Sequence, residues 1–176
     1  YVKFKMGLFE DPYGERYAHC KMHPQEGVQL SKEISDESVV LLKNENGLLP
    51  LNAEKLRSVA VIGPNADQVQ FGDYTWSRNN KDGMTPLAGI RQLLGDKVTV
   101  RYEKGCSLVS LDTSGIKKAV EVARQSEVAI VFCGSASAAL ARDYKSSTCG
   151  EGFDLNDLNL TGAQSQLIKE VYETGT

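Results

Sequence analysis

A glutamate between two glycines is the residue of this sequence whose setting most suggests chemistry. The stretch CGEGFD, residues 149–154, places Glu151 between Gly150 and Gly152, inside a long polar segment. Glycine permits unusual backbone conformations and a close approach of the backbone to a ligand, which suits a glutamate that reaches into a pocket. The alternative is a glycine-rich turn whose glutamate faces water, and these six residues alone leave both interpretations open.

The composition is that of an ordinary globular domain, and it excludes several classes of function. The chain has 176 residues, of which 41% are hydrophobic and 24% charged, and its net charge is −3. It has no basic run, so a nucleic-acid partner is not expected, and no apolar run long enough to span a membrane. The stretch HCKMH, residues 19–23, could supply metal ligands, but it lacks a second ligand cluster and the four cysteines show no CxxC spacing. We therefore expect neither a metal site nor a cofactor.

Alternating strand and helix patterns surround the glutamate. Short apolar runs rich in β-branched residues predict three strands, at 56–63, 97–102 and 128–134. Helical spacing of apolar residues predicts helices over 32–44, 86–94 and 114–125. Thr85 before Pro86 has the form of a helix N-cap, and Thr161 with Gln164 has the form of a capping box that opens a final helix. Thr161 also completes a glycosylation sequon with Asn159, but we assign it to the helix cap.

This alternation predicts an α/β fold, a three-layer α/β/α sandwich with a mainly parallel sheet. In such sheets ligands bind beyond the carboxyl ends of the strands, and Glu151 follows the carboxyl end of the third strand. The connection at 135–159 is far longer than the usual two to six residues or so, which favours a functional loop. Only three strands are predicted, so we expect the sandwich to be incomplete at both ends and the sequence to be a piece of a longer polypeptide.

Seven segments in order resemble glycoside hydrolase family 3, the retaining β-glucosidases and β-xylosidases. They read KFKMGLFEDPY, ESVVLLKNENGLLPL, VAVIGPNAD, GDYTW, TPLAGIRQLL, EVAIVFCG and CGEGFDLNDLNLTGAQSQLI, and together they span nearly the whole chain. The resemblance implies that residues 1–30 are the linker or tail of a preceding (β/α)8 barrel. Residues 31–176 would then be most of the second, α/β sandwich domain.

The resemblance also implies a function for Glu151. In the family the catalytic nucleophile is an aspartate on the barrel, outside this chain, and the general acid/base is a glutamate in a GEGxD context, which residues 150–154 match. Many members continue with arginine, whereas this chain has Leu155. The implied substrates are β-linked glucosides or xylosides cleaved from the chain end, without a cofactor, in a periplasmic or extracellular enzyme. Without the barrel, the 176 residues are expected to be inactive.

Other polar residues near Glu151 are weaker candidates. Arg142 and Lys145 could hydrogen-bond to sugar hydroxyls, although charged loop residues are more often simply solvated. Asp143 and Asp154 could be mistaken for the acid, although loop aspartates most often stabilise turns. Trp76 could stack on a sugar ring, but a single tryptophan more often packs against its own domain.

Two other classes of function share the strand and helix rhythm. A flavodoxin-like or nucleotide-binding domain would use the loop at 63–67, GPNAD, as its ligand loop. No GxGxxG or GxxxxGK[ST] follows a strand and no acidic residue is placed for a ribose, which argues against it. A non-catalytic interaction module is the other alternative.

Overall fold

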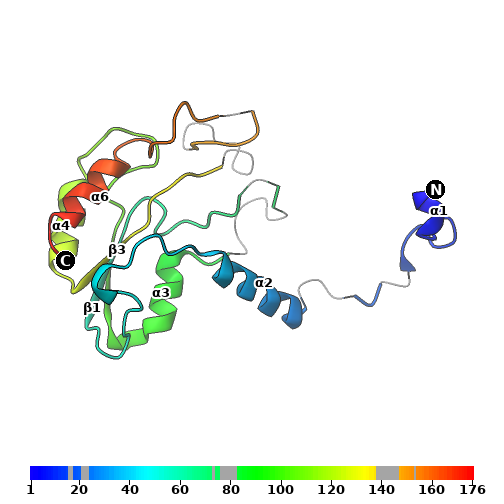
Figure 1. Cartoon of the computed structure of the whole chain (residues 1–176), viewed down its shortest axis with the longest axis horizontal. Coiled ribbons are helices and arrows are strands. Elements are labelled where there is room, and N and C mark those ends of the chain that lie inside the picture. Colours follow the sequence, from blue (N-terminus) through cyan, green and yellow to red (C-terminus); the bar gives the residue numbers. More distant parts are fainter. Residues whose placement is uncertain (16–17, 21–23, 73, 76–82, 138–146, 153) are drawn as a thin grey trace. The chain divides into compact units, whose positions relative to one another are not determined.

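The computed structural model describes residues 1–176 except 16–17, 21–23, 73, 76–82, 138–146 and 153. The chain divides into two compact units, Tyr1–Pro50 and Leu51–Thr176 (Figure 1). Among the helices of the described ranges, none combines the length and the apolar character needed to cross a membrane. Each unit is described below by itself.

The first unit contains helices α1 (Val2–Lys5) and α2 (Gln25–Ser38) and the 3₁₀ turn η2 (Glu45–Gly47). The helix predicted over 32–44 is therefore placed wrongly, because α2 begins earlier, directly after Pro24, and ends at Ser38. The predicted range includes the apolar run VVLL at 39–42, yet four consecutive residues point all around a helix and do not form one apolar face. In the structure the helix stops before this run, with Val39 extended.

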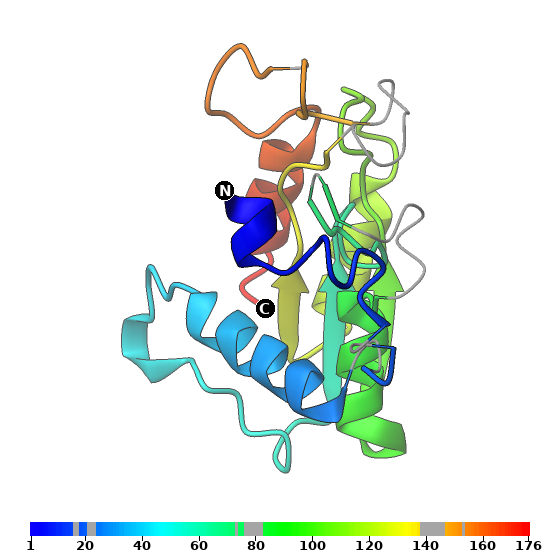
Figure 2. The ribbon, with the colours of Figure 1, turned by 90° about the vertical axis from the view of Figure 1, so that its right-hand side faces the viewer.

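The second unit is built on a parallel sheet of β1 (Ser58–Ile62), β2 (Thr99–Glu103) and β3 (Val128–Val131). Strand β1 lies in the middle, pairing Ser58 with Thr99 of β2 and Val59 with Val128 of β3. Figure 2 shows the strands side by side, with β1 between the other two. The three predicted strands and their parallel pairing are confirmed.

Helices cover both faces of this sheet. Helix α3 (Pro86–Leu94), followed by the 3₁₀ turn η3 (Gly95–Lys97), packs on the face formed by Val59 and Val61. Helices α4 (Ile116–Arg124) and α6 (Gln164–Tyr172) pack on the opposite face, formed by Ala60 and Ile62. Figure 1 shows α4 and α6 on one side of the strands and α3 on the other. The predicted three-layer α/β/α arrangement is confirmed, and residues 59–62 of the central strand are each at most 1% exposed because both faces of that strand are covered.

The two predicted helix starts have different outcomes. Thr85 caps α3 as expected, since its hydroxyl oxygen accepts a hydrogen bond from the backbone N–H of Ala88 at 3.1 Å, and its own hydroxyl donates to Asp67 at 2.9 Å. The capping box at Thr161 is wrong. The N-cap of α6 is Ala163, without a side-chain cap, and the Thr161 hydroxyl instead donates to the carbonyl of Leu108 at 2.6 Å.

Candidate active site

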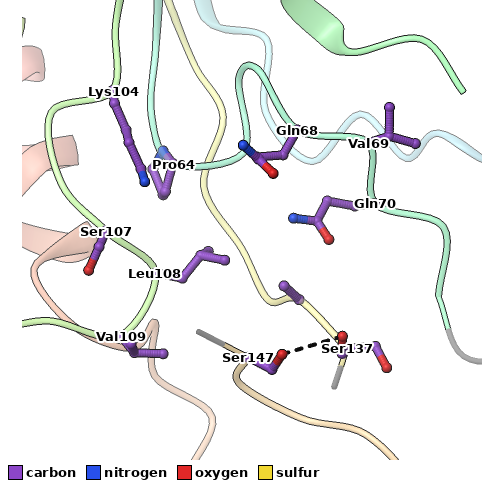
Figure 3. Close-up of a pocket in the computed structure, with 11 residues that line it drawn as sticks. Pro64, Gln68, Val69, Gln70, Lys104, Ser107, Leu108, Val109, Ser137 and Ser147 are labelled. Atoms are coloured by element: carbon purple, nitrogen blue, oxygen red, sulfur yellow. Dashed lines mark hydrogen bonds between the residues drawn. The ribbon is translucent and has the colours of Figure 1, made fainter. Parts of the chain in front are cut away.

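The carboxyl ends of the three strands lead to one edge of the sheet, and a cavity with polar and apolar lining residues lies there. It has a volume of about 220 Å³ and is lined by segments that follow β1, β2 and β3. Figure 3 shows Gln68, Gln70 and Leu108 directed into the same space, with Ser137 and Ser147 beside it. The Ser147 hydroxyl donates to the backbone carbonyl of Ser137 at 3.5 Å. A cavity at this edge is what a parallel sheet predicts.

Two residues close the base of the long loop after β3. The backbone N–H of Thr148 donates to the Ala136 carbonyl at 2.8 Å, and the N–H of Ala136 donates to the Thr148 hydroxyl oxygen at 2.9 Å. Thr148 is buried, and an isolated parallel bridge joins Ser137 to Cys149. These contacts fix the backbone three residues before Glu151, so its position is set by the end of the sheet rather than by the loop alone.

Glu151 lies in an exposed turn directly after this closure. Its neighbours Gly150 and Gly152 have φ angles of 145° and 72°, in the region that side-chain-bearing residues rarely adopt. A Cβ at residue 152 would meet no atom of the described residues within 4 Å, so the glycine there is explained by its φ of 72° and not by crowding. The two glycines therefore turn the chain sharply and present the carboxyl group in open space.

The weaker candidates from the sequence are placed as follows. Asp154 is exposed and lines a second cavity of about 460 Å³ together with Leu155, Thr148 and Thr161. Among the described residues that line this cavity, Glu151 is absent. Arg142, Asp143, Lys145 and Trp76 lie outside the described residues.

Gln164 is a residue of this region whose role sequence reasoning missed. It is fully buried, and its side chain bonds to backbone groups before and after the loop, at Gly134 and Thr161, and to Leu108. The sequence showed it only as the last letter of an apparent capping box. A glutamine at a position that continues the apolar face of a helix, with Leu167 and Val171, was the available signal.

Two thiols lie beneath the candidate site. Burial raises the pKa of Cys106, and it raises the pKa of Cys133, which packs against the same core cluster, to about 11. Both are therefore neutral thiols near pH 7. His19 and Cys20 are exposed, and among the described residues no group of three histidine, cysteine or acidic side chains is arranged to hold a metal.

The glycine of the 63–67 loop, considered above as an alternative nucleotide site, is explained by packing between the strand ends. A Cβ at Gly63 would lie 2.1 Å from the Phe132 carbonyl oxygen, and the Gly63 N–H donates to the Glu103 carbonyl at 3.2 Å. This glycine therefore serves the contact between the strand ends, and its presence does not indicate a phosphate-binding loop.

Comparison with known proteins decides the family. Residues 39–176 match the glycosyl hydrolase family 3 C-terminal domain. The chain belongs to glycosyl hydrolase family 3. It is 32% identical to a β-xylosidase of Formosa agariphila, with 99% of this chain and 24% of the relative covered. It is 31% identical to a periplasmic β-glucosidase of Salmonella typhimurium, with 99% of this chain and 25% of the relative covered.

A solved structure agrees with this family 3 assignment. The chain superimposes on a β-glucosidase from Erythrobacter marinus with a TM-score of 0.76 at 28% identity, covering 99% of this chain and 26% of that one. This family 3 chain spans about a quarter of the length of each of these proteins. The resemblance drawn from the sequence is confirmed, and the family found is not that of a flavodoxin-like or nucleotide-binding domain.

Proposed function

We propose that this chain is part of a retaining, exo-acting β-glycosidase that hydrolyses β-glucosides or β-xylosides, and that Glu151 is its general acid/base. The observation that carries the proposal is the exposed turn at Glu151, fixed to the carboxyl edge of the sheet by the Ala136–Thr148 closure and flanked by two glycines with positive φ. The β-xylosidase and β-glucosidase relatives support the substrate class.

The proposed reaction needs a second carboxylate, about 5 Å from the first in retaining enzymes. A (β/α)8 barrel joined through residues 1–30 would supply it, with residues 31–176 as the second domain. That carboxylate attacks the anomeric carbon while Glu151 transfers its proton to the glycosidic oxygen, and the bond to the leaving group breaks. Glu151, now a carboxylate, then takes a proton from water as the water oxygen attacks the anomeric carbon and displaces the nucleophile.

The exposed position of Glu151 is consistent with a mechanism in which the two carboxylates come from two domains. An acid/base that meets its substrate only at an interface must extend from its own domain, and the side chain of Glu151 is exposed. The flanking glycines allow small backbone rotations that bring the carboxyl group to the glycosidic oxygen. We also propose a periplasmic or extracellular location, which the periplasmic relative of Salmonella typhimurium supports.

A series of aryl glycosides tests the role of Glu151 in the full-length polypeptide. Glu151→Gln should slow substrates with poor leaving groups on the order of a hundredfold or more, because these need a proton on the departing oxygen. The first step on activated nitrophenyl glycosides should change little. Asp154→Asn is the matched control and should lower the rates of hydrolysis of all substrates equally or not at all. An equal loss on all substrates for Glu151→Gln would contradict the assignment.

A further inference from the structure

Gln164 places a buried amide between the two ends of the long loop. It is the first residue of α6 and is 0% exposed. A buried amide is costly unless its donors and acceptor are satisfied, so its partners show what the residue holds in place. These partners are Leu108 in the segment after β2, Gly134 just after β3, and Thr161 just before α6.

The contacts of Gln164 use both ends of its amide. Its Oε1 accepts a hydrogen bond from the Gly134 backbone N–H at 2.9 Å. Its Nε2 lies 3.1 Å from the carbonyls of Gly134 and Thr161 and 3.2 Å from that of Leu108. The Thr161 hydroxyl donates to the same Leu108 carbonyl. Gln164 therefore binds the point where the chain leaves the sheet and the point where it returns to α6.

Only a few residues separate these anchor points from Glu151. Ala136 follows Gly134 by two positions and makes the paired hydrogen bonds with Thr148 described above. Thr148 precedes Glu151 by three positions. Two sets of hydrogen bonds, Gln164 with Gly134 and Ala136 with Thr148, are thus joined by short backbone segments that lead to the turn at Glu151.

We infer that Gln164 is a positioning residue for the general acid/base, acting through Gly134 and the Ala136–Thr148 closure. The inference rests on the proposed function of Glu151. A role confined to helix α6 would not require this amide, because an apolar residue of similar size would fill the same buried space. Hydrogen bonds to residues 30 and 56 positions away in the sequence instead hold the loop ends.

Gln164→Met removes the hydrogen bonds and keeps most of the volume. In the full-length polypeptide we expect kcat/KM, which reports the first chemical step, to fall at least about tenfold more on glycosides with poor leaving groups than on activated aryl glycosides, because a displaced acid fails where protonation is needed. Val171→Ala, on the buried side of the same helix, is the matched control for lost stability and should show no such selectivity.

Thr148→Val tests the same link with a milder change, should Gln164→Met fold poorly. Valine keeps the shape of threonine and loses the hydroxyl that accepts from Ala136. It should show the same selectivity for poor leaving groups, whereas Thr148→Ser keeps the hydroxyl and should restore the wild-type pattern. Equal losses on both substrate types in Thr148→Val and Gln164→Met would overturn the inference.

Hydrogen exchange separates this inference from the proposed function. In Gln164→Met the backbone amides of Gly134, Ala136 and Thr148 should exchange faster than in Val171→Ala, whatever Glu151 does. Unchanged exchange would overturn the positioning role even if Glu151→Gln shows the expected leaving-group selectivity. Faster exchange together with a Glu151→Gln variant that lacks selectivity would show that Gln164 holds the loop, but that the proposed acid/base is wrong.

Discussion

Glu151 owes its position to residues that are not acidic. Gly150 and Gly152 provide φ angles of 145° and 72°, and Thr148 fixes the chain just before them. A carboxyl group held in this way is exposed just beyond the carboxyl edge of the sheet. The proposed chemistry of Glu151 would therefore depend on backbone conformation and on hydrogen bonds three residues away as well as on the glutamate itself.

The cysteines allow a residue-scale prediction, because burial separates their reactivities. Burial raises the pKa of Cys133 to about 11, so the reactive thiolate is scarce at pH 7.5, whereas Cys20 is exposed. Iodoacetamide should modify Cys20 rapidly and Cys133 only after unfolding in urea, as followed by peptide mass spectrometry. Labelling of native Cys133 at the rate of Cys20 would show that its environment is not buried.

Helix α6 packs on the sheet and contacts the loop ends. Two adjacent residues lie on opposite sides of this helix, one buried and one exposed. Leu167 is 0% exposed, whereas Ile168 is 40% exposed. Leu167→Ala should lower the free energy of unfolding by about 2–5 kcal/mol, the usual cost of a cavity in a packed core. Ile168→Ala should cost less than about 1 kcal/mol. Urea denaturation of both variants measures the difference, and equal costs would contradict the packing of α6.

The starts of β1 and β3 are joined by Glu127, which gives the sheet a dependence on pH. Hydrogen bonds from the Arg57 backbone N–H and then from its side chain lower the pKa of Glu127. A lowered folded-state pKa contributes stability above the unfolded-state value, near 4.3, and this contribution is lost as the pH falls through the folded-state value. Glu127→Gln should remove the part of the acid-induced loss of stability that comes from Glu127. Thermal denaturation of the wild type and Glu127→Gln between pH 3 and pH 7 tests this prediction. An identical dependence of the melting temperature on pH in both proteins would contradict it.

Elements whose cause is local were predictable from the sequence. The three strands follow from apolar, β-branched runs, and α3 follows from Thr85 and Pro86. The start of α6 was not predictable in the same way, since Thr161 and Gln164 carry the letters of a capping box but bond to Leu108 and Gly134, more than 25 positions away. Helix α2 was misplaced because the apolar run after Ser38 was assigned to a helix face.

In the candidate site, too, locally determined features were predictable from the sequence and tertiary contacts were not. The position of Glu151 beyond the third strand was predictable from the parallel fold, and the glycines around it from their letters. The Ala136–Thr148 closure was not, because it joins residues whose proximity depends on the path of the whole loop. Tertiary hydrogen bonds of this kind leave no pattern in a single sequence.

We predict that the 176-residue chain cannot catalyse the proposed reaction alone. It spans about a quarter of its relatives, and the proposed nucleophile lies outside it. The purified 176-residue chain should not release nitrophenol from nitrophenyl β-glucoside or β-xyloside above background, because one carboxylate cannot complete the double displacement. Turnover that survives Glu151→Ala would contradict both the proposed mechanism and the role of the barrel.

Chemical rescue of the full-length Glu151→Gln variant tests whether Glu151 is the general acid/base. On an activated aryl glycoside this variant should form the glycosyl-enzyme but hydrolyse it slowly, because no general base activates water. Azide needs no general base, so it should restore turnover and give the β-glycosyl azide, identified by NMR of the product. Asp154→Asn should show no rescue. If azide leaves Glu151→Gln unchanged and instead rescues Asp154→Asn, Glu151 is not the acid/base.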